Sequence, residues 1–281
     1  MDALLPPAMA ERAETIGATK ARLDAWRLLT LAVLAGAFIA FGAMFSTIAA
    51  VGASGVLPYG VTRVLVGVVF SVGLILVVVG GAELFTGNNL MVMAWAGGKV
   101  SAREIARAWG LVYLGNFAGA AATALFVFLS GHYADGAGGV GAIALTAAQA
   151  KADMGFVPAL VRGILANVLV CLAVWLCYSA RTTTDRILAV VPPVAAFVAA
   201  GFEHSVANMY ALPFALLVKD YAPPDFWAAI GSSPAAFDDL TWQVLYTNLV
   251  PVTLGNLIGG SVLVGGIYWF VYLRKASVPV P

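Results

Sequence analysis

Two short polar segments interrupt long apolar stretches of this chain. Residues 81–88 and 201–208 each contain a glycine, a glutamate and an asparagine at the same spacing, 120 positions apart. Apolar sequence seldom contains such residues, because an unpaired polar or charged group away from water is costly. We therefore expect the two segments to form a duplicated site in the interior of a membrane protein.

Composition supports a membrane environment. Hydrophobic residues make up 62% of the chain and charged residues 10%, and the mean hydropathy is +0.94, which is unlike a soluble globular protein. A bilayer core requires about 20 apolar residues per helix. Two long apolar stretches, about 61–96 and 187–218, contain the polar segments, and we interpret each as one broken span. Four uninterrupted stretches complete six spans, at about 28–51, 108–129, 156–179 and 246–273.

The first 26 residues contain charges of both signs between Glu11 and Asp24 and lack the features of a cleaved signal peptide. They predict an amphipathic cytoplasmic segment, followed by a six-span domain from 27 to 281. Basic residues in short loops set the orientation, and eleven of them fall on the side of the N-terminus against three on the other, which predicts cytoplasmic termini. Arg162 is left out because it lies deep in a span. The eleven are Arg12, Lys20, Arg22, Arg27, Lys99, Arg103, Arg107, Arg181, Arg186, Arg274 and Lys275, and the three are Arg63, Lys151 and Lys219.

An inverted internal repeat follows from this arrangement, with halves at about 27–130 and 155–275. The second and fifth spans run in opposite directions, so the two polar segments lie on oppositely directed helices. Leu-Gly-Asn-x-x-Gly also occurs at both 114–119 and 254–259, and its Gly-x-x-x-Gly spacing lets helices approach closely. Interrupted helices at corresponding places in inverted halves indicate a binding or permeation site near the midplane. Each break also frees a helix N-terminus, which favours an anion.

His204 and Thr86 are the candidates for the centre of this site. His204 is the histidine within an apolar stretch, since His132 lies in a loop. An ionisable group inside a membrane is a functional candidate, and a histidine takes up a proton near physiological pH. It could lend that proton to a weak acid, and the Thr86 hydroxyl could donate to an oxyanion or to the imidazole. The alternatives are a histidine that only braces the break and a threonine that only caps a helix.

The glutamates and asparagines of the two segments are expected to support the broken helices. Glu83 and Glu203 would repel an anion, so we expect them to accept N–H groups of the broken backbone. Asn88 and Asn208 are expected to cap or brace the half-helices.

Other polar residues inside the spans have more than one interpretation. Asn116 and Asn256 favour interhelical contacts, and Asn167 is placed to reach either the breaks or a neighbouring helix. Cys171 and Cys177 lie in one apolar helix and are interpreted as packing residues rather than redox or metal ligands.

Apolar residues flank the breaks. Phe70 and Leu74 precede the first break, while Phe197 and Phe202 precede or enter the second. Such residues are usually part of a packed core, but beside a polar centre they also form dry constrictions. Lys151, near the outer start of the fourth span, is either a solvated loop residue or one that attracts anions.

At this point the sequence resembles the formate/nitrite transporter family. The resemblance is carried by Gly-Phe-Glu-His-Ser-Val-Ala-Asn-Met at 201–209 and Glu-Leu-Phe-Thr-Gly at 83–87, and it extends over nearly the whole chain. Segments at 58–62, 70–76 and 164–175 are most like its formate-channel branch. Two departures are noted: the 83–87 motif is closer to the nitrite branch, and Arg162 stands where the formate branch usually has an apolar residue.

The resemblance implies an aquaporin-like protomer with its own pore, assembled as a homopentamer in a bacterial inner membrane. It also implies a flexible N-terminal segment, within 1–26, that gates the cytoplasmic mouth. The resemblance implies that Phe70 and Leu74 form one constriction and that Phe197 forms the other. It places Thr86 and His204 between the two constrictions and ties Glu203 to the histidine. It places Lys151 and Asn167 near the outer entrance and along the conducting path.

The leading prediction is a pH-dependent formate channel in which His204 exchanges a proton with a small monovalent anion. The same fold with nitrite, hydrosulfide or a short carboxylate as cargo is the first alternative, and a channel for water or a neutral solute is less favoured because the sequence has no Asn-Pro-Ala pair. A membrane enzyme is disfavoured, since no Cys/His cluster offers a cofactor or metal site. A net charge of +1 gives no indication of nucleic-acid binding.

Overall fold

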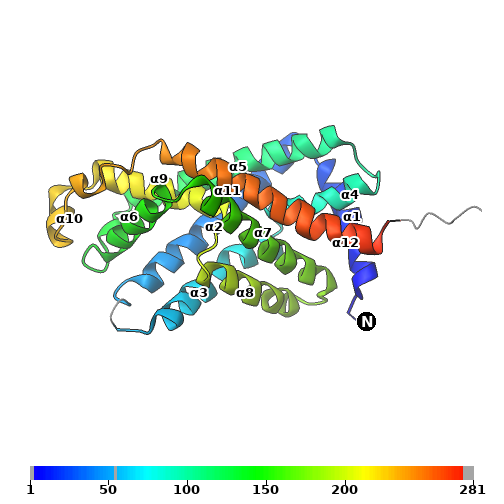
Figure 1. Ribbon diagram of the computed structural model, residues 1–281, viewed down its shortest axis with the longest axis horizontal. Coiled ribbons are helices and arrows are strands. Elements are labelled where there is room, and N and C mark those ends of the chain that lie inside the picture. The colour runs from blue at the N-terminus through cyan, green and yellow to red at the C-terminus, as the bar shows by residue number, and fades with distance from the viewer. Residues whose placement is uncertain (1–2, 54–55, 275–281) are drawn as a thin grey trace, which may run out of the picture.

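The computed structural model describes residues 3–53 and 56–274, and all regular secondary structure within them is helical (Figure 1). Lys275, which was assigned above to the cytoplasmic side, and the outermost residues of the predicted ranges 1–26 and 27–281 lie outside the described residues. Five continuous helices in the described ranges are long and apolar enough to cross a membrane. They correspond to predicted spans one, two, three, four and six.

The first half of the chain contains three spans and a short re-entrant segment. Its elements are α1 (Pro6–Ala21), α2 (Ala25–Ala50), α3 (Tyr59–Gly80), the 3-10 helix η1 (Gly87–Met91), α4 (Val92–Ala96) and α5 (Ala102–Leu129).

The second half follows the same order. Its elements are α6 (Gly139–Ala152), α7 (Phe156–Ser179), α8 (Thr183–Ala199), α9 (Ser205–Tyr221), α10 (Pro224–Ala229), α11 (Val244–Leu257), the π-helix η4 (Ile258–Gly266) and α12 (Ile267–Tyr272). Short 3-10 turns at His132–Ala134 and Pro234–Phe237 complete the description. The helices α6 and α10, which we did not predict, lie at the opposite end of the bundle from α1 and α12 (Figure 1).

Both predicted breaks are confirmed. The helix α3 ends at Gly80 and α8 ends at Ala199. A glycine with left-handed backbone comes directly after α3, Gly81 at φ +79°, and two residues after the end of α8, Gly201 at φ +72°. Only glycine adopts this conformation without steric cost, which is why the polar segments begin with one. The chain then runs extended before the next helix starts, so neither long apolar stretch is a continuous rod.

The predicted inverted repeat is confirmed by how α3 and α8 pack. A side chain at Gly67 would meet Ala195, while Ser71 donates from Oγ to the carbonyl oxygen of Val191 at 3.5 Å. Residue numbers increase along α3 as they decrease along α8, so the two broken spans are antiparallel. The first and third spans of each half are parallel, since Gly115 and Gly119 of α5 meet successive turns of α2.

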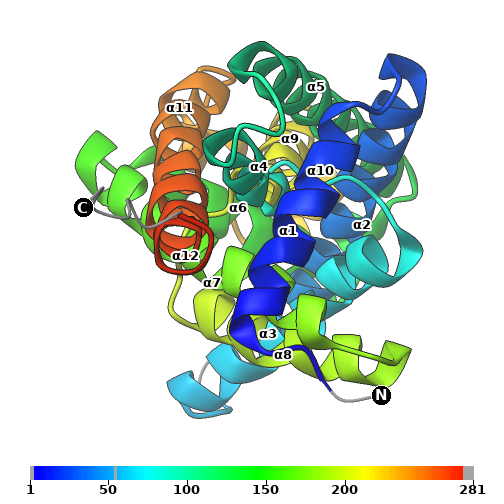
Figure 2. The ribbon, with the colours of Figure 1, turned by 90° about the vertical axis from the view of Figure 1, so that its right-hand side faces the viewer.

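The repeat also includes the helix that precedes each set of three spans. Lys20 at the end of α1 and Lys151 at the end of α6 are 131 positions apart. The same offset separates Leu31 of α2 and Arg162 of α7, whose carbonyl oxygens accept from the N–H groups of Glu83 and Glu203 in the two breaks. The correspondence therefore extends upstream of the predicted halves 27–130 and 155–275. Figure 2 shows α1 lying across one end of the bundle, where Met9, Ala10 and Ala13 are buried.

The last span differs from the uniform helix that we expected for 246–273. Residues Ile258–Gly266 form a π-helix between α11 and α12. The segment contains the pairs Gly259-Gly260 and Gly265-Gly266, and residues without side chains tolerate the wider turns and the close neighbours that a π-helix brings.

Close helix contact at the Gly-x-x-x-Gly positions gives a test of the packing. A Cβ at Gly119 would overlap the carbonyl oxygen of Val33, whereas a Cβ at Gly110 in the same helix would meet nothing within 4 Å. We expect Gly119→Ala to destabilise the protein by about 1–3 kcal/mol through overpacking, and Gly110→Ala to be neutral or slightly stabilising. Thermal unfolding in detergent measures both, and equal melting temperatures for the two variants would contradict the α2–α5 contact.

Candidate permeation site

The two breaks meet at a threonine and a histidine. Thr86, in the first break, and His204, in the second, are both buried. The Thr86 Oγ1 and His204 Nε2 atoms lie 2.9 Å apart. This contact joins the two halves of the repeat through the side chains that we expected at the centre.

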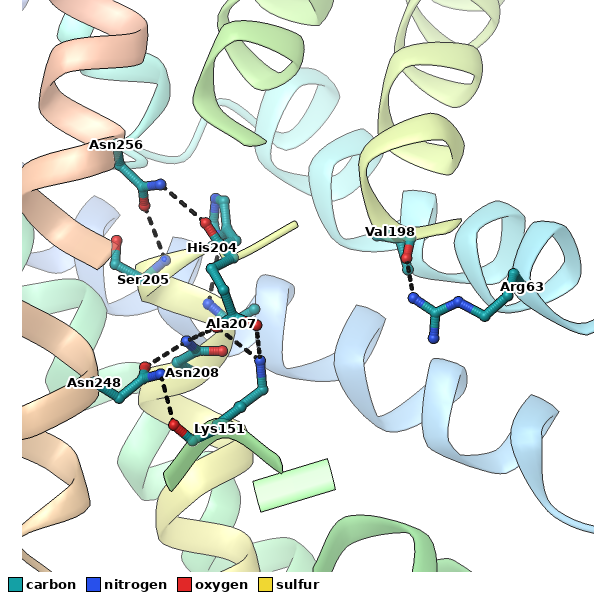
Figure 3. Close-up of polar contacts among 10 residues, drawn as sticks. Arg63, Lys151, Val198, His204, Ser205, Ala207, Asn208, Asn248 and Asn256 are labelled. Carbon is teal, nitrogen blue, oxygen red and sulfur yellow. Dashed lines mark hydrogen bonds and ion pairs between the residues drawn. The ribbon is translucent and has the colours of Figure 1, made fainter. Parts of the chain in front are cut away.

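The backbone of α9 determines which nitrogen of His204 carries the proton. His204 is the N-cap of α9, and its Nδ1 accepts a hydrogen bond from the backbone N–H of Ala207 at 3.1 Å (Figure 3). An accepting nitrogen has no proton, so the neutral ring carries its proton on Nε2, which faces Thr86. The Thr86 hydroxyl then accepts from Nε2–H and keeps its own hydrogen for another acceptor.

Each break contains a buried glutamate that binds an asparagine and a lysine. Glu83 accepts hydrogen bonds from Asn88 Nδ2 at 2.8 Å and pairs with Lys20 Nζ at 3.0 Å. Lys20 also donates to Asn88 Oδ1 at 3.0 Å. The carboxylate is therefore stabilised by one cation and one amide despite its burial.

The second break repeats this arrangement. Glu203 accepts from Asn208 Nδ2 at 2.6 Å and from Lys151 Nζ at 2.7 and 2.9 Å. Asn208 also donates to Asn248 Oδ1 at 2.7 Å, and Figure 3 shows Lys151 reaching toward the same group of side chains.

These contacts differ from two of our expectations and reveal the role of one residue that we missed. The hydrogen bonds of Glu83 and Glu203 within the described residues come from asparagine and lysine side chains, not from the broken backbone as expected. Lys151 is bound to Glu203, where we had placed it as a solvated or anion-attracting residue at the entrance. Sequence reasoning missed Lys20 altogether, because a lysine in a polar N-terminal segment looks like an ordinary surface charge; the repeated Lys-Ala at 20–21 and 151–152 was the available signal.

The broken backbone itself is bound by the asparagines of the Leu-Gly-Asn motifs. Asn116 accepts from the Phe85 N–H at 2.8 Å and donates to the carbonyl oxygens of Ala32 at 2.8 Å and Glu83 at 2.9 Å. These are more than interhelical contacts, because they replace helix hydrogen bonds that the break removes.

Asn256 makes the equivalent three bonds in the second half. It accepts from the Ser205 N–H at 2.9 Å and donates to the carbonyl oxygens of Gly163 at 2.8 Å and Glu203 at 3.0 Å (Figure 3). The two breaks are thus held in the same way by residues 140 positions apart.

Asn167 contacts both the first break and a neighbouring helix, so both of its interpretations hold. Its Nδ2 lies 2.6 Å from the carbonyl oxygen of Asn256, 2.7 Å from Asn89 Oδ1 and 3.3 Å from the carbonyl oxygen of Thr86. Cys171 Sγ donates to the same Thr86 carbonyl at 3.3 Å. Neither cysteine forms a disulfide, and no cluster of three or more potential metal ligands occurs in the described ranges.

Two cavities lie on either side of the centre. The cavity on the side of α1, named the inner cavity for the predicted orientation, is about 230 Å³; it is lined by Leu74, Glu83 and Asn88 and is covered by Arg12 and Lys20.

The outer cavity, about 480 Å³, is lined by Phe70, Phe197, Phe202 and His204. The rings of Phe70 and Phe197 meet edge to face with centroids 5.7 Å apart, and Phe197 stacks on His204 at 5.9 Å. Phe70 therefore faces Phe197, while Leu74, one helical turn further along α3, faces the other cavity. The assignment of these residues to constrictions stays a prediction.

An all-helical membrane protein with twin broken spans, a cavity on each side and polar side chains between them has the architecture of a transport protein. The family model described as formate/nitrite transporter matches residues 7–270, and the chain belongs to that family of transporters, not to the enzymes.

Individual relatives extend over nearly the whole chain. The formate channel FocA of Escherichia coli strain K12 is 46% identical over 275 residues, which cover 98% of this chain and 96% of the relative. FocA of Haemophilus influenzae is 38% identical over 264 residues, covering 94% and 93%. A solved pentameric formate channel with formate bound has a TM-score of 0.84 at 42% identity, and the match covers 89% of this chain and 98% of that one.

The lysine and glutamate of the second break allow a double-mutant test. Lys151→Met leaves the buried Glu203 charge without its cation, which we expect to cost about 3–5 kcal/mol of unfolding free energy. Adding Glu203→Gln to this variant removes the unpaired charge and should restore much of the loss.

The exposed pair Arg27–Asp24, at 3.3 Å, provides the control, because the same cycle there should give less than about 1 kcal/mol. Equal coupling energies at the two sites would show that the buried pair has no special role in holding the break.

Proposed function

We propose that the chain is a formate channel in which the small anion passes the Phe70–Phe197 contact as the neutral acid after proton exchange at His204. The observation that carries the proposal is the Thr86–His204 contact, at 2.9 Å, between the two breaks. It is supported by the formate channels among the relatives and by the solved channel with formate bound. A bare anion between two phenylalanine rings is strongly disfavoured, whereas the neutral acid avoids most of that desolvation.

The geometry of His204 constrains how a proton moves. The neutral ring donates from Nε2 to Thr86, so it has no second proton to give. A transferable proton requires the doubly protonated ring, in which Nδ1 can no longer accept from Ala207. Charging the ring therefore breaks the N-cap of α9, and loss of the proton to the anion restores it. Glu203, adjacent in sequence, and Lys151, bound to it, are charged groups near the ring, and Arg63 and Arg162 line the same cavity.

The assembly and placement of the chain follow the same relatives. We propose a homopentamer in a bacterial inner membrane, with α1 and α12 on the cytoplasmic side where the basic loop residues gather. Large exposed apolar residues on α5 are suited to lipid or to neighbouring subunits: Leu114, Leu125, Phe126 and Leu129.

Nitrite is the second candidate cargo, favoured by the Glu-Leu-Phe-Thr-Gly motif at 83–87 and by the scope of the family model. Competition of formate uptake by nitrite and by hydrosulfide in proteoliposomes distinguishes the cargoes. A strong preference for nitrite would replace formate in the proposal.

Replacement of the histidine tests proton exchange. His204→Phe and His204→Asn should remove most of the change in formate flux between about pH 5 and pH 8, because no group remains to take up the proton. His132→Asn, in an exposed pair with Asp135 at 2.7 Å, is the control and should keep the wild-type profile. An unaltered pH profile in both His204 variants would refute proton exchange.

The helix α1 covers the inner cavity, and we propose that it gates that mouth. Arg12 donates to the carbonyl oxygen of Tyr178 at 3.2 Å and Lys20 pairs with Glu83. The triple variant Arg12→Ala/Lys20→Ala/Glu83→Gln, in which the last change avoids an unpaired charge, should raise the open probability in single-channel recordings. Arg27→Ala is the control on the same side, and recordings in which all variants match the wild type would exclude a gate held by these contacts.

A further inference from the structure

The outer cavity has more positive charge than its carboxylate balances. Its charged lining residues are Arg63, Lys151, Arg162 and Glu203. With His204 neutral, three cations face one carboxylate. An excess of positive charge between low-dielectric walls concentrates small anions.

Lys151 contributes little to this excess. Its Nζ lies 2.7 and 2.9 Å from the two carboxylate oxygens of Glu203, so the two charges offset each other. The positive charge available to a ligand therefore belongs to the two arginines.

Arg63 is fixed in place by the end of α8. Its Nε donates to the carbonyl oxygen of Ala199 at 3.0 Å and its Nη2 to that of Val198 at 2.5 Å (Figure 3). A guanidinium has five N–H donors, and these two bonds leave three for other acceptors. The side chain is thus an oriented cation beside the second break.

The side chain of Arg162 makes no hydrogen bond or ion pair within residues 3–53 and 56–274. Its side chain is exposed on the second turn of α7, and its charge interacts with Glu203 only through space. Its backbone oxygen accepts from the Glu203 N–H at 3.3 Å, which fixes where the side chain starts.

The first half of the repeat shows that a charge is not needed at this position. The carbonyl oxygen of Leu31 accepts from the Glu83 N–H at 3.2 Å, which makes Leu31 the counterpart of Arg162. An apolar side chain is therefore sufficient to hold a break. Because this contact is made by a backbone oxygen, it leaves the guanidinium of Arg162 available to a ligand.

We infer that the outer cavity is an anion-binding site, with Arg162 as the main ligand and Arg63 as the second cation, that takes a small carboxylate before it passes Phe70 and Phe197. A planar guanidinium offers paired N–H groups that match the two oxygens of a carboxylate. The identity of the ligand as formate rests on the proposed function. The site's role in that function is to raise the local concentration of the anion at the outer mouth.

The test is the variant Arg162→Leu, which gives the second half the residue found in the first. Uptake of external formate is measured in right-side-out membrane vesicles. We expect KM to rise about tenfold at low salt, with a maximal rate that changes less than twofold. In about 1 M salt, where the screening length is about 3 Å, the difference should disappear. Arg162→Lys should retain part of the effect, and Arg103→Leu removes one exposed charge from the other end as the matched control.

A binding measurement separates this inference from the proposed function. Sodium formate replaces sodium chloride at constant ionic strength, and the melting temperature of the purified protein is recorded. Formate should raise it for the wild type and for Arg103→Leu, but not for Arg162→Leu or Arg162→Gln. A wild-type KM together with a wild-type melting response in both Arg162 variants overturns the inference. Wild-type vesicles without formate uptake refute the proposed function, while a melting response that depends on Arg162 still supports the site.

Discussion

Unpaired backbone groups at membrane depth are the constraint on which this structure depends. Each break frees N–H and C=O groups of the backbone. One asparagine, Asn116 or Asn256, binds an N–H and a C=O of each break and also donates to a carbonyl oxygen of the adjacent span. Because irregular backbone survives in a membrane only when it is satisfied within the protein, these two amides allow the breaks to exist. Because the two breaks exist, Thr86 and His204 can meet between the two halves of the chain.

The glutamate, asparagine and lysine groups form a second layer around the breaks. In each group a lysine pairs with the glutamate, whose negative charge would otherwise oppose anion passage. The lysines come from helices outside the spans, Lys20 on α1 and Lys151 on α6. The repeat therefore unites a preceding helix with three spans in each half. This organisation places the inner cavity under α1 and the outer cavity beside α6.

Local patterns predicted much of this architecture. The two left-handed glycines, the two Leu-Gly-Asn motifs and the isolated His204 stand out against apolar sequence, so the breaks, the inverted repeat and the central pair could be predicted. The role of Lys20 was not predicted, because its partner Glu83 lies 63 positions away and the repeated Lys-Ala is the one sequence signal that connects it to the breaks. The π-helix was missed for another reason: its residues are as apolar and helix-compatible as those of an ordinary span, and only the glycine pairs mark it.

The π-helix of the last span has a consequence for the centre of the molecule. At Gly260 a side chain would overlap the amide of Asn167 as well as Asn89 and Cys171, and the next residue, Ser261, donates to the Asn89 carbonyl at 3.4 Å. A π turn contains one more residue than an α-helical turn. The number of residues in this segment therefore sets how far α12 is rotated about the helix axis relative to α11. The segment acts as a spacer: insertion or deletion of a single residue there would turn the distal part of the span relative to Asn256 and would shift the contacts of Gly260 and Ser261 with Asn167 and Asn89 beside the first break.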